Sequence, residues 1–191
     1  MSKNRLEAFS DGVIAILITI MVLELKVPHG ATWGALGPLV PELLTYAMSF
    51  VYIAIYWNNH HHMLHMTTRI NGKILWANMH LLFWLSLVPF VTGWMGENHF
   101  EALPTAFYGA ALLLAAAAYT LLQMAIIADQ GDGSPLAAAV GKDVKGKLSV
   151  VFYVLAIPLA FVHQSISHAL YVLVALMWLI PDRRIERSLA E

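Results

Sequence analysis

Residues 5–27 read RLEAFSDGVIAILITIMVLELKV and combine an apolar helix with acidic residues near both of its ends. The uncharged run, residues 12–23, covers only about 18 Å of helix at 1.5 Å per residue. A bilayer core of about 30 Å needs roughly twenty residues. A spanning helix must therefore carry Asp11 close to membrane depth, with Glu24 at its other end. Ionisable groups at that depth are costly, and they usually face protein or a water-filled cavity.

The apolar part of this stretch has two distinct sides at about 100° per residue. We predict that one stripe lines an ion pore and that the other anchors the helix to its neighbours. Taken alone, apolar residues at helical spacing more often indicate ordinary packing. The pore stripe comprises Gly12, Ile16, Thr19, Ile20 and Leu23, and the anchoring stripe comprises Asp11, Ala15, Ile18 and Val22.

The composition is typical of a membrane protein. Of its 191 residues, 59% are hydrophobic and 12% are charged, whereas charge in soluble domains is nearer a quarter. Several long apolar runs predict an all-α polytopic membrane protein whose residues 1–191 form a single domain. The net charge of −1 argues against a nucleic-acid partner. The absence of cysteine excludes disulfides and thiolate metal sites.

The N-terminus resembles a signal peptide because Lys3 and Arg5 precede an apolar run. Signal peptides avoid acidic residues, however, and this N-terminal segment contains Glu7 and Asp11. No cleavage site of the small-x-small kind follows the run. We expect this segment to be retained as a helix.

Six membrane spans are predicted, with Pro41 suited to a helix start and Pro89 expected to kink the third span. The spans are residues 6–26, 41–67, 72–95, 103–128, 148–162 and 166–180. Small residues in the fourth span, at 109–111 and 115–118, favour close helix packing. Residues 137–147 are expected to form an amphiphilic connector, and the polar tail is expected to extend the last helix into water.

The distribution of basic residues supports this count. With six spans, ten of the eleven Lys and Arg residues fall on one side, and only Lys26 falls on the other. The positive-inside rule then predicts that both termini are cytoplasmic. The ten are Lys3, Arg5, Arg69, Lys73, Lys142, Lys145, Lys147, Arg183, Arg184 and Arg187.

Asp11 has two interpretations. As an acid in the first turn of a helix it would be stabilised by the helix dipole, with Ser10 beside it as a cap. Alternatively, a buried Arg5–Ser10–Asp11 network fixes the first helix to the second and third, because buried charges need partners.

The second span ends in WNNHHHMLH, where His61 and His65 share a helix face as metal-ligand pairs do. A metal- or haem-dependent membrane enzyme using His60, His61 and His65 is therefore the alternative function. Di-iron membrane enzymes need several histidine clusters, and no carboxylate-x-x-His pattern occurs in a span. The histidines outside this cluster are single: His29, His80, His99, His163 and His168.

Hydrogen bonds from these histidines to Asp11, Asn58 or Asn78 are favoured, because buried polar groups need partners. We expect no resident metal or cofactor and no catalytic residue. Histidine titrates near neutral pH, so these side chains allow a response to pH.

A proton-coupled transporter is a further alternative. It would need acidic residues at the middle of the bilayer, whereas Asp11 and Glu24 lie near the helix ends.

No carbonyl filter of the TVGYG kind occurs in the chain, so side chains would have to supply any ion selectivity. Six short helices are few to enclose a pathway within one subunit. An ion-conducting protein built from them is expected to be an oligomer.

The motif Arg5-x-x-x-Phe9-Ser10-Asp11, followed by GVIAILITIMVLEL, resembles the first helix of the bacterial relatives of the transmembrane protein 175 family. The resemblance continues in residues 56–61, YWNNHH, and in residues 75–78, LWAN, with Pro89-Phe90 farther on. It covers about the first ninety residues. Its departures from the family pattern are the run of three histidines and Met79-His80 after Asn78.

The resemblance implies a homotetramer in a bacterial inner membrane, with four first helices around a pore that passes potassium and other monovalent cations. By position, Ile16 would form the narrowest layer, Ile20 and Leu23 further layers, and Thr19 a hydroxyl ring that sets cation preference. A structural network would position the first helix. Its expected members are Arg5, Phe9, Ser10, Asp11, His60, His61 and Asn78.

Overall fold

The structure is a computed structural model that describes residues 2–179. Within this range every regular element is a helix, which confirms the all-α prediction for the described part. The elements are α1 (Lys3–Leu23), α2 (Trp33–Leu36), the 3-10 turn η1 (Gly37–Leu39), α3 (Val40–His65), α4 (Gly72–Ser86), α5 (Val88–Glu97), α6 (Ala102–Gln130), α7 (Pro135–Val140), α8 (Val144–Leu159) and α9 (Gln164–Leu179).

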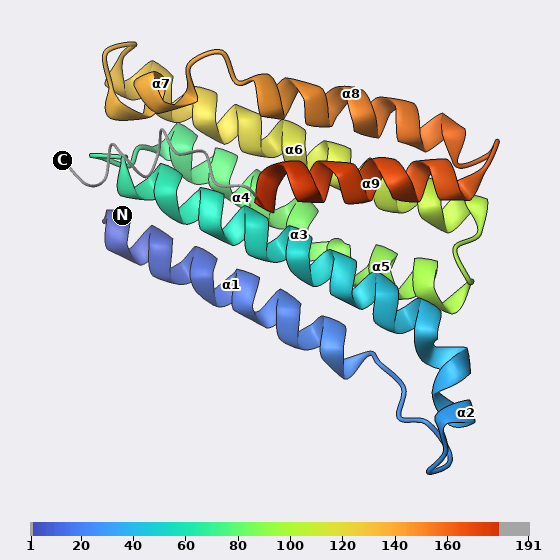
Figure 1. Cartoon of the computed structure of the whole chain (residues 1–191). Coiled ribbons are helices and arrows are strands. Elements are labelled where there is room, and N and C mark those ends of the chain that lie inside the picture. Colours follow the sequence, from blue (N-terminus) through green and yellow to red (C-terminus); the bar gives the residue numbers. More distant parts are fainter. Residues whose placement is uncertain (1, 180–191) are drawn as a thin grey trace.

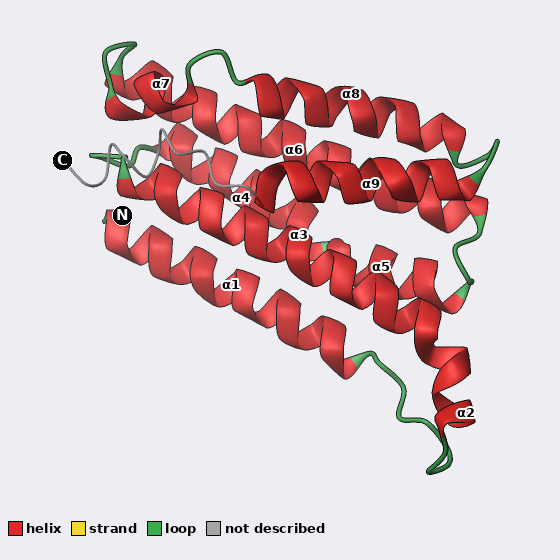
Figure 2. Cartoon of the chain, in the orientation of Figure 1, coloured by secondary structure: helices red, strands yellow, loops and turns green. Residues whose placement is uncertain are grey.

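The long helices lie side by side and run in alternating directions, with α4 and α5 together making one pass (Figure 1). The connections gather at the two ends of this bundle (Figure 2). Ion pairs join elements at each end. Arg69 after α3 donates to Asp129 of α6 at 2.8 Å, and Lys26 after α1 donates to Glu97 of α5 at 2.6 Å.

Helix α1 lies at one edge of the bundle beside α3 (Figure 1). It begins and ends about a turn before the predicted span of residues 6–26. The amide of Glu24 closes the last turn on Ile20. The chain then leaves the bundle, because Pro28 and Gly30 follow, and it returns through α2 and η1.

The third predicted span is broken into α4 and α5 at Leu87. Pro89 lies in the first turn of α5 and has no N–H to donate to the carbonyl of Leu85. The predicted kink at Pro89 is confirmed. Asn71 caps the start of α4, because its side chain accepts from the amide of Ile74.

The predicted connector, residues 137–147, is wrong in its second half. Helix α7 stops at Val140, and α8 already begins at Val144. Gly141 and Asp143 between them have positive φ angles of 52° and 43°, which turn the chain back onto the bundle. The Asp143 carboxylate accepts from the amide of Gly146 and so caps α8.

Four helical segments of the described chain are long and apolar enough to cross a membrane. They are Lys3–Leu23, Trp33–His65, Gly72–Glu97 and Ala102–Gln130. Helices α8 and α9 have 16 residues each, about 24 Å of helix. Ile180, the predicted end of the last span, and the tail with Arg183, Arg184 and Arg187 lie outside the described residues.

Two apolar clusters form the core, and α3 and α6 contribute to both. The first joins these helices to α1, α4, α7 and the first residue of α5, Val88, and the second joins them to α5, α8 and α9. In α6 the buried small residues include Gly109, Ala111, Ala115 and Ala118, as the small-residue patches predicted.

Candidate functional site

The stripe of α1 that was predicted to line a pore is exposed along its whole length. The exposed fractions are 57% for Ile16, 38% for Ile20 and 80% for Leu23. Gly12 and Thr19, on the same side, are also exposed. The subunit therefore presents a continuous surface of mainly apolar residues along α1, open to a partner, lipid or water.

Thr19 has a defined arrangement within this stripe. Its hydroxyl donates to the backbone carbonyl of Ile16 at 2.8 Å, one turn earlier. Because the hydroxyl proton is held by the helix itself, the oxygen lone pairs remain available on the exposed side. The exposed Thr19 oxygen is thus an acceptor, which suits contact with a cation.

The predicted anchoring stripe is wrong. Ala15 and Val22 are exposed, and Asp11 and Ile18 are only partly buried. The buried side of α1 instead comprises Leu6, Ser10, Ile14, Leu17 and Met21, which lie about 140° from the pore stripe at 100° per residue. The apolar residues of α1 surround the helix, so spacing alone did not identify the side that contacts α3, α4 and α5.

A buried chain of hydrogen bonds fixes α1 to α3 and α4. The Asn78 amide nitrogen donates to the Ser10 hydroxyl oxygen at 3.0 Å. The Asn78 carbonyl oxygen lies 2.7 Å from His60 Nε2, so the ring nitrogen donates to it. All three side chains are at most 1% exposed. The structure therefore brings together residues from three helices that lie far apart in the sequence.

Asp11 lies beside this chain but bonds a different partner. Its carboxylate accepts from the indole nitrogen of Trp57 at 2.9 Å. Trp57, His61 and His65 form a stacked column on α3, with ring centroids 6.0 and 6.2 Å apart. Sequence reasoning did not assign Trp57 to the network. Its position one turn before His61, in the motif shared with the family, was the available signal.

Arg5 and Phe9 are exposed on the same side of α1 as the pore stripe. Within residues 2–179, no hydrogen bond or ion pair joins Arg5 to another side chain. The predicted Arg5–Ser10–Asp11 network is therefore divided in the single subunit, with Ser10 buried and Arg5 on the opposite side. His61 stacks on its neighbours and has no hydrogen bond to Asp11 or Asn78 among the described residues.

Helix α1 is also held at both of its ends. Lys3 donates to the backbone carbonyl of His65 at 2.7 Å, at the end where α3 stops. At the opposite end, Lys26 bonds Glu97, and this hydrogen bond raises the pKa of the Lys26 ammonium. These contacts and the Asn78 chain define the position of α1 along its length.

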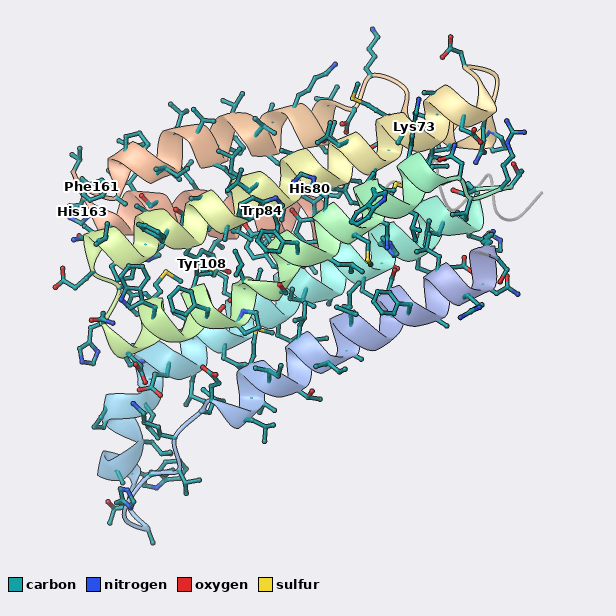
Figure 3. The ribbon with its side chains drawn as sticks, turned by 180° about the vertical axis from the view of Figure 1, so that it is seen from behind. Lys73, His80, Trp84, Tyr108, Phe161 and His163 are labelled. Atoms are coloured by element: carbon teal, nitrogen blue, oxygen red, sulfur yellow. The ribbon has the colours of Figure 1, made fainter. Side chains whose placement is uncertain are left out.

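Histidine ligands do not converge elsewhere in the described chain. Residues 2–179 contain no group of three or more His, Asp or Glu side chains that could hold a metal ion. The Nε2 atom of His80 accepts a hydrogen bond from the indole nitrogen of Trp84, on the same helix, at 2.8 Å (Figure 3).

Comparison with known proteins places this arrangement in one family. The family model described as "Endosomal/lysosomal potassium channel TMEM175" matches residues 5–89, which contain most of α1 and the whole of α3 and α4. A potassium channel of Chryseobacterium is 54% identical over 191 residues and covers 100% of both chains. A potassium channel of Streptomyces collinus is 31% identical, with 92% of this chain and 91% of that protein aligned.

A solved structure agrees with the fold as well. The crystal structure of a lysosomal potassium-selective channel TMEM175 homolog from Chamaesiphon minutus superposes with a TM-score of 0.83 at 27% sequence identity. The match covers 94% of this chain and 97% of that one. The chain therefore belongs to the TMEM175 family of channels.

Proposed function

We propose that this protein is a homotetrameric, potassium-permeable channel in which four copies of α1 surround a central pore. The observation that carries the proposal is the exposed stripe of α1, with Ile16, Ile20 and Leu23 open in the single subunit. The bacterial relatives of this chain are named potassium channels, and in such a family an exposed stripe is best explained as the lining of a pathway between subunits.

Ile16 forms the constriction in this proposal. Four branched apolar side chains that meet on an axis exclude water, and apolar constrictions in channels gate by dewetting. Ile20 and Leu23 form further apolar layers toward the end of α1 near Glu97. Opening requires the four helices to rotate or move apart, because the side chains alone cannot clear the axis.

Thr19 provides the selectivity layer. Four hydroxyl oxygens, each with its proton directed to the Ile16 carbonyl, replace part of the hydration shell of a cation. Hydroxyl oxygens are few and carry no formal charge, so the resulting preference for potassium is modest. No carbonyl filter and no resident cofactor are needed for this mechanism.

The buried chain of Ser10, Asn78 and His60 couples the pore helix to the rest of the subunit. Because these groups are almost fully buried, a rotation of α1 that separates Ser10 from Asn78 leaves polar groups unpaired. The chain therefore favours one position of α1. Arg5 and Phe9, on the opposite side, take contacts from a neighbouring subunit in this tetramer.

Six passes per subunit place both termini on the cytoplasmic side of a bacterial inner membrane. The charge distribution supports this orientation, since only Lys26 among the basic residues falls on the far side. The four long apolar segments support the first four passes, and α8 and α9 are proposed as the two shorter passes that follow.

The test is potassium flux in liposomes with Ile16→Asn. We expect faster flux than in the parent protein, because a polar ring hydrates the constriction. Val22→Asn is the matched control, since Val22 is exposed on the same helix but lies about 120° away from Ile16. Unchanged flux in a folded Ile16→Asn protein, or equal increases in both variants, would contradict the assignment of the constriction.

A further inference from the structure

A small cavity lies within the subunit, away from α1, between α3, α6, α8 and α9. Its volume is about 50 Å³. Aromatic rings from all four helices line it, namely Tyr56, Tyr119, Tyr153 and Trp178. The Tyr56 and Tyr119 rings lie 6.2 Å apart in an edge-to-face arrangement. Aromatic rings that line a small space provide a site for a cation, because the face of an aromatic ring is electronegative.

Polar groups in the same cavity strengthen this preference. Asp143 contributes a carboxylate, and its Oδ1 accepts a hydrogen bond from the amide of Gly146 at 3.1 Å. A Cβ at Gly146 would overlap this carboxylate, so the glycine allows the acid to lie against the first turn of α8. Gln123 is buried, and no hydrogen bond joins its side chain to another described residue. The cavity thus offers a negative charge and a side-chain amide among aromatic residues.

The cavity adjoins a larger one of about 270 Å³ that is open at the surface. The two share Asn59, Tyr119, Gln123, Asp143 and Trp178 as lining residues. The outer cavity adds two lysines, Lys142 and Lys145, and the apolar residues Leu136 and Val140. The Lys145 ammonium lies 5.8 Å from the centre of the Trp178 ring, so this ring already holds one cation.

We propose that the two cavities bind a small primary ammonium joined to a phosphate, the chemistry of a phosphoethanolamine group. A cavity of about 50 Å³ holds roughly three to five water-sized atoms, which matches an ethanolammonium. The carboxylate of Asp143 and the rings of Tyr56, Tyr119 and Tyr153 take the ammonium. Lys142 and Lys145 take the phosphate, and the apolar residues at the mouth adjoin any acyl chains.

Two sources carry this chemistry, a phosphatidylethanolamine lipid and soluble phosphoethanolamine. Native mass spectrometry of the full-length protein in nanodiscs containing phosphatidylethanolamine and phosphatidylglycerol measures lipid retention. Titration with soluble O-phosphorylethanolamine, followed by tryptophan fluorescence, measures binding of the free headgroup. We expect selective retention of phosphatidylethanolamine, and displacement by the soluble compound would identify the headgroup as sufficient.

The decisive variant is Asp143→Asn, because asparagine still caps a helix and removes only the charge. We expect about a tenfold loss of affinity for the ammonium ligand, which corresponds to the removal of one charge-assisted contact. Asp132→Asn is the matched control, since Asp132 is an exposed acid of the neighbouring α6–α7 connection and lines neither cavity. Gly146→Ala provides a second test, because its methyl group displaces the carboxylate, and a similar loss is expected.

Equal retention of the two lipids, or equal affinity in Asp143→Asn and the parent protein, would overturn the proposal. The cavity would then be a hydrated packing space. Each of these experiments measures binding. A negative result would therefore not bear on the proposed α1 pore, which is tested separately by ion flux.

Discussion

Asn78 is the residue that connects α1 to the subunit most directly. Its amide nitrogen and oxygen contact Ser10 and His60, which belong to two other helices. Both atoms are paired at the same time, and the side chain has no solvent exposure. A buried amide paired in this way specifies one position for α1, because any shift leaves a donor or an acceptor unsatisfied.

Ser10→Ala should lower the free energy of unfolding by about 1–3 kcal/mol, since it leaves the Asn78 amide without its buried acceptor. Chemical denaturation in detergent measures this change. Ser86→Ala is the control, because that hydroxyl is exposed and donates to Phe83 within its own helix. Equal stability of the two variants would show that the buried chain contributes nothing specific.

Thr19→Val should reduce the ratio of potassium to sodium flux by roughly two- to tenfold, the range for loss of a hydrogen-bond-like contact of about 0.5–1.5 kcal/mol. Total flux should be retained, because valine has nearly the same shape. Thr120→Val removes a similar hydroxyl on α6, one that donates to its own helix at Ala116. That control should keep the parent ratio, and a ratio unaffected by Thr19→Val would exclude this hydroxyl from selectivity.

At the scale of elements, α6 holds the two core clusters together through close packing. Gly109 lies directly against Tyr171 of α9, whose hydroxyl donates to the carbonyl of Thr105 at 3.0 Å. Helix α3 is joined to α6 and α5 nearby. The hydroxyl oxygen of Ser49 lies 3.1 Å from that of Tyr108 and 2.6 Å from that of Thr92. Tyr108 is visible in the interior from the rear (Figure 3).

Gly109→Ala should destabilise the bundle by about 1–3 kcal/mol, because a Cβ there overlaps the Tyr171 hydroxyl and forces α6 and α9 apart. A lower temperature of unfolding measures the effect. Gly72→Ala is the matched control, since nothing lies within 4 Å of a Cβ at that position. A stable Gly109→Ala protein would mean that the two helices adjust without cost.

At the scale of the whole molecule, the proposed pore depends on contacts between copies of the chain. Helix α1 packs on one side only, and its exposed stripe lies about 140° from its buried side. A closed ring of identical subunits places the same stripe of each copy toward one axis. The described part of one subunit thus exposes the stripe of the proposed pore, and the proposed pathway forms only between copies.

Ile16→Cys tests this arrangement cleanly, because the chain contains no other cysteine. Silver ions should block potassium flux through this variant by at least tenfold, since a ring of thiolates at the constriction binds soft metals. Mass measurement of the purified protein should give four times the mass of the chain. Val154→Cys, exposed on α8, should remain insensitive. Insensitivity of Ile16→Cys would remove Ile16 from the pathway.

Much of the fold follows from local sequence. Apolar runs predicted α1, α3 and α6 to within a few residues, and Pro89 predicted the break between α4 and α5. Such features depend on residues close together in the chain. The turn at Gly141 and Asp143 was missed, because its positive φ angles follow from how α7 and α8 pack onto the bundle.

The sequence by itself determined the all-helical membrane class, the boundaries of the main helices and the family motif around Ser10 and Asp11. Only the tertiary structure decided which side of α1 is buried, and that Trp57 rather than a histidine donates to Asp11. The physical reason is that α1 is apolar on nearly every side, so hydrophobicity does not distinguish its faces. The distinction comes from α3, α4 and α5, which cover one side and leave Ile16 exposed.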